Sequence, residues 1–329
     1  MKIRDFGVEM WMNAYENNCT YNLAETCVKS LTVQELAGLS GKGDKVWEDI
    51  RAMQLTYGDI EGSAALREGL CGLYETVRPE NTTITHGAIG ANDLVINALV
   101  EPGVISVLPT YQQLYSIPES LGAKVKICHL REENGFLPDL AELKSLVDGK
   151  TKLICINNPN NPTGVLMDGA LLRSVAEIAA GCGAWVLCDE AYRGLNHTQY
   201  GENFAPAMAD LYEKGVSVGS FSKTFSLAGL RLGWVAAPVE LIERINRRRD
   251  YNTISCGKID DYLAALAIRS REALLRRNLK IVADNAAVLD AWVNSEPRIS
   301  YVKPKAGTTA FLKYDAPVDS VTFCKRLLK

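Results

Sequence analysis

The chain has 329 residues, 47% of them hydrophobic and 23% charged, which is enough for one large α/β domain and a smaller one. A formal net charge of −3 argues against a protein that binds nucleic acid electrostatically. The N-terminal residues contain no apolar signal region, and no apolar run reaches the roughly 18 residues that span a membrane. Secretion and membrane insertion are therefore not expected.

Three other residue patterns predict no site. The nine cysteines are scattered without a Cys-x-x-Cys pair, which favours a reducing cytoplasm. The histidines, at 86, 129 and 197, are too dispersed to predict a metal site. The run Arg247-Arg248-Arg249 is expected to be a solvated helix end rather than a phosphate-binding patch.

Strand and helix patterns alternate from about residue 82. Short β-branched runs predict strands at 82–85, 104–108, 124–128, 152–157, 184–189, 216–220 and 232–238. Helical patterns lie between several of them, at 92–100, 139–147 and 171–183. This alternation predicts an α/β fold with a mostly parallel central sheet flanked by helices, because near-continuous apolar strands indicate a sheet buried on both faces.

The C-terminal part has a different pattern. Residues 239–294 are predicted to be mostly helical, with a break expected around 253–257. Short strands are expected after Pro297, including one at 310–315.

Four polar clusters follow predicted strands, at the edge where open α/β sheets place their ligands. They are THGAIGAND (85–93), NNPNNPTG (157–164), CDEAYRGL (188–195) and SFSKTFSLAGLRLGW (220–234). Each one alone has an ordinary explanation, such as a βα turn, a plain loop or an Asp that caps a helix.

A phosphorylated carbonyl cofactor would use all four clusters. Lys223 could form a Schiff base with an aldehyde, and Asp189 could keep a pyridine nitrogen protonated. Asn161 and Tyr192 suit a phenolic oxygen. Phosphate could bind at the glycine turn of residues 87–90, where a helix begins, with Ser220 and Arg231 as further donors.

Together with YGDIEGSAALREGL (57–70) and PTYQQLY (109–115), these motifs give a specific resemblance. The chain resembles the fold-type-I, pyridoxal-phosphate-dependent enzymes of the class I/II aminotransferase family, which are aspartate-aminotransferase-like. The resemblance extends from Tyr57 to Pro238 and continues weakly to the end. It implies a large cofactor-binding domain at 45–250, an N-terminal arm at 1–44 that contributes to the small domain and substrate lid, and a connecting helix with a small domain at 251–329.

The resemblance also implies the role of each site residue. Lys223 would hold pyridoxal phosphate as a Schiff base, Asp189 would pair with the pyridinium nitrogen, and Tyr192 and Asn161 would bond the phenolate oxygen. Tyr111 would cover one face of the cofactor ring. The phosphate would bind to Gly87, Ala88, Ile89, Ser220 and Arg231. Tyr57 would reach the phosphate of a neighbouring subunit, so a homodimer is implied.

Substrate residues are less specified by the motifs. Ala24 and Glu25 fall in the region of the family's substrate lid and are expected to contact substrate. The family's arginine for the substrate α-carboxylate would follow the segment KAGTTAFLKYD (305–315), and the sequence ends at Lys329 before it. Either the small domain is incomplete, which is the expectation, or the substrate carboxylate is bound in another way.

The implied reaction is a ping-pong transfer of an amino group between an L-amino acid and a 2-oxo acid, with Lys223 as general base and acid. A C–S β-lyase and an amino-acid cyclase on the same scaffold would use the same cofactor residues and stay open as alternatives. Lys223 argues against a non-catalytic binding protein. The hypothesis of a nicotinamide-dependent oxidoreductase has only the turn between Gly87 and Gly90 to support it.

Overall fold

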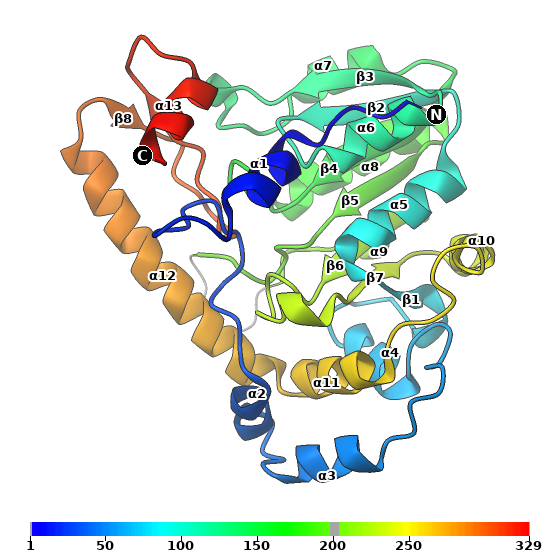
Figure 1. Ribbon diagram of the computed structural model, residues 1–329. Helices are drawn as coiled ribbons and strands as arrows, with labels where there is room; N and C mark the ends of the chain where they lie inside the picture. The colour runs from blue at the N-terminus through cyan, green and yellow to red at the C-terminus, as the bar shows by residue number, and fades with distance from the viewer. Residues whose placement is uncertain (1, 198–203, 329) are drawn as a thin grey trace.

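A computed structural model describes residues 2–197 and 204–328 (Figure 1). Its α-helices are α1 (Gly7–Tyr15), α2 (Val33–Leu39), α3 (Lys45–Ala52), α4 (Ala64–Cys71), α5 (Gly87–Leu99), α6 (Gln113–Ser120), α7 (Leu140–Leu146), α8 (Gly169–Cys182), α9 (Met208–Leu211), α10 (Val239–Arg249), α11 (Lys258–Arg269), α12 (Arg271–Ser295) and α13 (Ser320–Leu327). Short 3-10 helices are η1 (Pro79–Asn81), η2 (Glu132–Asn134) and η3 (Ala228–Leu230).

A seven-stranded sheet forms the centre of the molecule. Its strands are β1 (Thr82–Thr85), β2 (Gly103–Leu108), β3 (Lys124–His129), β4 (Thr151–Asn157), β5 (Trp185–Asp189), β6 (Gly215–Ser220) and β7 (Gly233–Ala236). They lie in the order β1-β7-β6-β5-β4-β2-β3. β7 is antiparallel to both β1 and β6, and the other neighbouring strands pair in parallel. The predicted mostly parallel sheet is confirmed, with every predicted strand in place.

Helices cover both faces of this sheet, and the alternation of side chains along each strand explains how. In β4, Leu153 and Cys155 pack toward α5 and α10, whereas Ile154 and Ile156 pack toward α7 and α8. Successive side chains of a strand point to opposite faces, so a strand buried on both faces needs an unbroken apolar run. The sequence KLICIN supplies one.

Helices α2 and α3 lie at the opposite end of the molecule from α7 (Figure 1). Leu36 of α2 and Val46 of α3 belong to one apolar cluster with Leu70 of α4 and Leu266 of α11. From α11 the long helix α12 leads across the molecule to a small two-stranded sheet, β8 (Ile299–Ser300) with β9 (Lys313–Tyr314) (Figure 1). None of the helices in the part of the chain described here is long and apolar enough to cross a membrane.

Two expectations are corrected. The strand expected at 310–315 is only Lys313–Tyr314, because its partner β8 has two residues and offers no further pairing. Arg249 is not a solvated helix end: it is 1% exposed and donates from Nη2 to Asn246 Oδ1 at 2.8 Å. It lies one helical turn after Ile245 on the buried face of α10, and that position overrides its charge. The predicted break before α11 is confirmed, at residues 250–257.

Candidate active site

The carboxyl ends of β4, β5 and β6 bring the polar clusters together. Asn157 and Asp189 are register partners at the ends of β4 and β5, and Asn157 Nδ2 donates to the Asp189 carbonyl at 2.7 Å. Ser220 is the last residue of β6, which pairs with β5 in parallel. Parallel strands end at the same sheet edge, so these residues share one site.

Asp189 is buried and held at both carboxylate oxygens. Oδ1 accepts from the Ala191 N–H at 3.0 Å, and Oδ2 accepts from Asn92 Nδ2 at 2.7 Å. Burial raises the pKa of Asp189, while the contacts with Asn92 and Ala191 and the charge of Lys223 act against that rise. These two hydrogen bonds therefore stabilise the ionised Asp189 carboxylate, as an anionic partner for a protonated ring nitrogen requires.

Asn161 and Tyr192 meet at the same edge. Asn161 Nδ2 lies 3.4 Å from the Tyr192 hydroxyl oxygen, and the Asn161 N–H donates to Asn157 Oδ1 at 2.6 Å. The loop after β4 is thus tied to the strand end that precedes it. Burial raises the pKa of Tyr192, and the charge of Lys223 opposes that rise.

Lys223 is paired with the N-terminal arm. Its Nζ donates to Thr26 Oγ1 at 2.6 Å and lies 3.2 Å from Cys27 Sγ. Burial lowers the pKa of Lys223, but Tyr192, Cys27 and Glu25 together outweigh burial and raise it. The lysine is therefore a charged group among acceptors, not a surface cation.

A cradle for an anion forms where α5 begins. Gly87 has φ of 68°, and a Cβ there would lie 3.0 Å from Arg231 Nη2, so the guanidinium packs directly on the turn. His86, which precedes the helix, does not cap its first turn with a side chain. Arg231 Nη1 also reaches Ser222 Oγ at 3.5 Å, and the Ser222 N–H donates to Ser220 Oγ at 3.0 Å.

Tyr111, the residue expected to cover the cofactor ring, contacts the N-terminal arm. Its hydroxyl donates to Glu9 Oε1 at 3.0 Å, and its ring lies 5.0 Å from that of Phe6. Burial raises the pKa of Tyr111, and the charges of Glu9 and Asp189 add to the rise. The arm at residues 6–9 therefore packs on the ring that was predicted to cover the cofactor.

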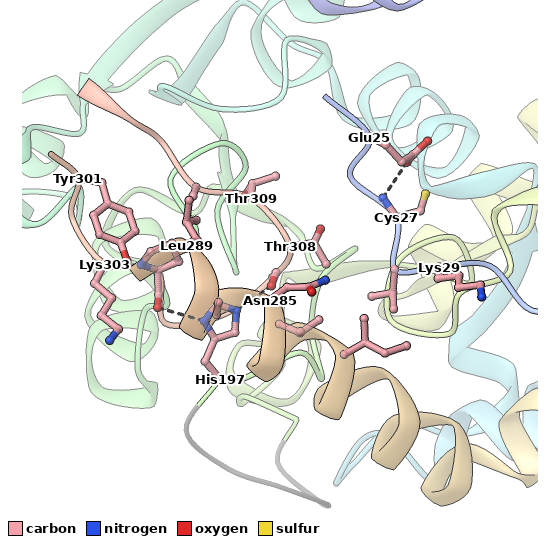
Figure 2. A pocket seen from close by; sticks show the side chains of 17 residues that line it. Glu25, Cys27, Lys29, His197, Asn285, Leu289, Tyr301, Lys303, Thr308 and Thr309 are labelled. Carbon is pink, nitrogen blue, oxygen red and sulfur yellow. Dashed lines mark hydrogen bonds between the residues drawn. The ribbon is translucent and has the colours of Figure 1, made fainter. Parts of the chain in front are cut away.

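A cavity of about 280 Å³ is lined in part by Cys27 (Figure 2), whose Sγ lies 3.2 Å from Lys223 Nζ. Glu25 and Cys27 line one end, and Tyr301 and Lys303 line the other, with α12 between them. The Glu25 carboxylate accepts from the Cys27 N–H at 2.7 Å. The cavity is not lined by Lys223 or Asp189, so it adjoins the cluster at the strand ends and is separate from it.

Two predicted residues, Tyr57 and Ala24, are exposed to solvent in this chain. Tyr57 is 79% exposed, on the segment before α4. Ala24 is exposed and is bonded only locally, to Asn22 Oδ1 at 3.0 Å. Glu25, in contrast, lies close enough for its charge to act on Lys223.

Sequence reasoning assigned no role to several residues that contact the predicted ones, among them Thr26, Cys27 and Asn92. Asn92 carried a usable signal, because an amide at a position where α5 otherwise packs Leu94, Val95 and Ile96 on the sheet needs a polar partner. Thr26 and Cys27 carried none, since nothing local in the sequence brings residue 26 to residue 223. Among the described residues, no group of three or more His, Cys, Asp or Glu side chains could hold a metal ion.

Comparison with known proteins identifies the family of this chain. The model of the family "Aminotransferase class I and II" matches residues 28–329. The chain belongs to this family. It is 34% identical over 226 residues to capreomycidine synthase of Streptomyces vinaceus and 32% identical over 263 residues to an aspartate aminotransferase of Pyrococcus horikoshii. The matches cover 68% and 76% of this chain, but only 57% and 66% of those two relatives.

Solved structures show the same similarity over the whole chain. A PLP-dependent aminotransferase from Streptococcus suis superposes with a TM-score of 0.95 at 44% identity, covering 100% of this chain and 87% of that one. The PLP-dependent cyclase OrfR superposes with a TM-score of 0.90 at 25% identity and the same coverage. The predicted family, fold type, enzyme class and cofactor class are those of these relatives.

Proposed function

We propose that the chain is a pyridoxal-phosphate-dependent aminotransferase that moves an amino group between an L-amino acid and a 2-oxo acid in two half-reactions. The observation that carries the proposal is the position of Lys223, whose Nζ lies among Thr26, Cys27 and Tyr192 at the sheet edge that also holds Asp189. The family and its PLP-dependent relatives support it.

The residues present fit this cofactor at each of its polar groups. The phosphate fits the turn at Gly87, where Arg231 and uncapped N–H groups of α5 converge. The ring nitrogen fits the buried carboxylate of Asp189, and the phenolic oxygen fits the pair of Asn161 and Tyr192. When bound, pyridoxal phosphate supplies a carbonyl that condenses with amines and a ring that withdraws electrons from the substrate Cα.

The chain's own residues then supply binding and proton transfer. Asp189 holds a negative charge at the far end of the site, and Arg231 fixes the phosphate end. Lys223 Nζ takes the proton that leaves Cα and returns it, so it must first lose the proton that its raised pKa retains. Thr26 Oγ1 orients that nitrogen at 2.6 Å, which limits where the proton can be delivered.

A cyclisation is the second candidate. It is favoured by the similarity to capreomycidine synthase, whose match covers 68% of this chain, and to the cyclase OrfR, whose structure covers 100% of it. The same proton transfer at Lys223 would begin either reaction, since both start by removing a proton from Cα. A β-elimination would need the same residues, and no contact in the chain favours it.

We further propose a homodimer in which Tyr57 reaches the partner's phosphate site. Tyr57 and Tyr251 are 79% and 93% exposed, and their segments lie side by side, because Gly58 packs against the Cys256 carbonyl. Near them Ile254 has φ of 59°, which is strained for a β-branched residue and is typical of functional contacts. An apolar surface of this kind favours burial by another chain.

A cytoplasmic location is proposed as well. All nine cysteines are free thiols, including the buried Cys155 and Cys188. A reducing compartment keeps such thiols unpaired.

Absorbance tests the main proposal. The protein loaded with pyridoxal phosphate should show a visible band that disappears in Lys223→Ala or after borohydride reduction. Lys214→Ala is the matched control, because the Lys214 Nζ donates to the Gly183 carbonyl at 3.0 Å, at the opposite end of β5 from Asp189. A colourless protein that does not take up the cofactor would refute the proposal. Amino-group transfer to a 2-oxo acid, measured across a panel of amino acids, then separates transfer from cyclisation.

A further inference from the structure

We propose that Asn92 is a positioning residue for Asp189: it holds the Asp189 carboxylate with one amide hydrogen and, through Gln113, ties it to the phosphate-binding turn at Ile89. The inference rests on the proposed function, because it concerns how the two ends of the cofactor site are kept in register. It assigns a role to two side chains that the cofactor itself does not need to touch.

Hydrogen bonds connect the Ile89 carbonyl, Gln113, Asn92 and Asp189 in that order. Gln113 Nε2 donates to the Ile89 carbonyl at 2.9 Å. Asn92 Nδ2 lies 3.3 Å from Gln113 Oε1 and 2.7 Å from Asp189 Oδ2. These residues come from α5, the start of α6 and the end of β5, so the chain spans three elements.

The Ile89 carbonyl determines which group is the donor and which the acceptor in each hydrogen bond of this series. A carbonyl can only accept, so Gln113 must present its NH₂ group to Ile89 and its oxygen to Asn92. Asn92 must then present its NH₂ group to both Gln113 and Asp189, because a flipped amide would set its oxygen against two other oxygens. Asn92 therefore acts as a donor to the Asp189 carboxylate in the only arrangement that satisfies all three groups.

Asn92 is an unfavourable residue for stability at this position. Its side chain is 0% exposed, and its Oδ1 has no hydrogen-bond partner among the described residues. A buried polar atom without a partner destabilises the folded state, and a leucine of similar size would remove that penalty. An amide at this position is therefore explained by what its NH₂ group does for Asp189 and not by packing.

The effect on Asp189 is electrostatic. Burial favours the protonated carboxyl, and the Asn92 contact is the largest influence that opposes burial. Asp189 must stay ionised to pair with a protonated ring nitrogen. Because Gln113 fixes Asn92 to the turn at Ile89, the anion and the phosphate cradle keep a constant separation, which preorganises the site.

The test compares Asn92→Leu and Gln113→Met with the matched control Asn97→Leu, an amide on the same helix that bonds Asp93 instead. The Asp189 carboxyl is followed by ¹³C NMR during a pH titration of the cofactor-free proteins, with Asp189→Asn to assign the signal. Cofactor affinity and thermal unfolding are measured on the same samples.

We expect Asn92→Leu to move the Asp189 titration to higher pH and to weaken pyridoxal phosphate binding about tenfold, with a loss of thermal stability at neutral pH that disappears below the Asp189 titration. Gln113→Met should move the titration in the same direction by less, and it decides the question if Asn92→Leu does not fold. Unchanged titration and affinity in folded variants would overturn the inference. Failure of the wild-type protein to bind pyridoxal phosphate would instead overturn the proposed function, and the titration would still report on Asn92.

Discussion

Lys223 Nζ donates to Thr26 Oγ1 at 2.6 Å across 197 residues of chain. This bond joins the central residue of the proposed site to the N-terminal arm. We expect Thr26→Val to lower the rate of proton transfer from Cα about tenfold, because the lysine loses the acceptor that orients it. Single-turnover absorbance measures that step.

Thr26→Ser is the control for this change, since it keeps the hydroxyl and loses only a methyl group. Its rate should stay within a factor of about two of the wild type. Equal losses in both variants would mean that the methyl group's packing, and not the hydrogen bond to Lys223, is what matters.

The turn at Gly87 predicts a phosphate-specific effect. Gly87→Ala places a side chain on a residue with φ of 68° and 3.0 Å from Arg231 Nη2, so the cradle must open. We expect weaker binding of pyridoxal phosphate, by about tenfold or more, and little change for pyridoxal, which lacks the phosphate. Gly90→Ala should bind both compounds normally, because a Cβ there meets only His86 Cβ at 3.7 Å.

We predict that a change at Asp189 affects cofactor binding and turnover to different extents. Asp189→Ala should retain part of the cofactor, since Arg231 and Lys223 remain, but it should lose most turnover because the ring nitrogen has no anionic partner. The measurement is turnover per bound cofactor. Near-native turnover in Asp189→Ala would rule out the role assigned to this residue.

Glu190 gives the protein a pH-dependent stability. Burial raises the pKa of Glu190 from 4.5 to about 7, against the opposing charge of Arg193. The folded state thus holds a proton that the unfolded chain loses near pH 4.5, so stability falls as pH rises from about 4.5 to 7. The loss is on the order of 3 kcal/mol. In Glu190→Gln this decline should disappear, as measured by urea unfolding at several pH values.

The proposed homodimer places the exposed Tyr57 and Tyr251 in its interface, so a change there should alter the assembly state. Tyr251→Asp should shift the protein toward monomer in sedimentation equilibrium, because it places a charge in the proposed interface. Val288→Asp, on an exposed position of α12, is the control and should leave the assembly unchanged. A wild-type protein that is a fully active monomer would contradict the dimer and the role of Tyr57.

The sheet and most of the polar residues at its edge were predictable because their signals are local. An apolar run such as KLICIN predicts a buried strand, and a polar residue directly after it, such as Asp189, must lie at the strand's end. Thr26 and Cys27 were not predictable, because only the three-dimensional path of the arm brings them to Lys223. Arg249 was misjudged because the charges of its neighbours concealed a position on the buried face of α10.

The arm at residues 26–29 is fastened from the far end of the sequence. Thr308 Oγ1 donates to the Thr26 carbonyl at 2.5 Å, and Arg277 Nη2 donates to the Lys29 carbonyl at 2.9 Å. On the ribosome, where synthesis runs from the N-terminus, this segment emerges before Arg277 and lacks the second of its two hydrogen-bond donors until Thr308 follows. The acceptors of Lys223 are therefore among the last parts of the site to assemble, and cofactor added during synthesis would meet an open site.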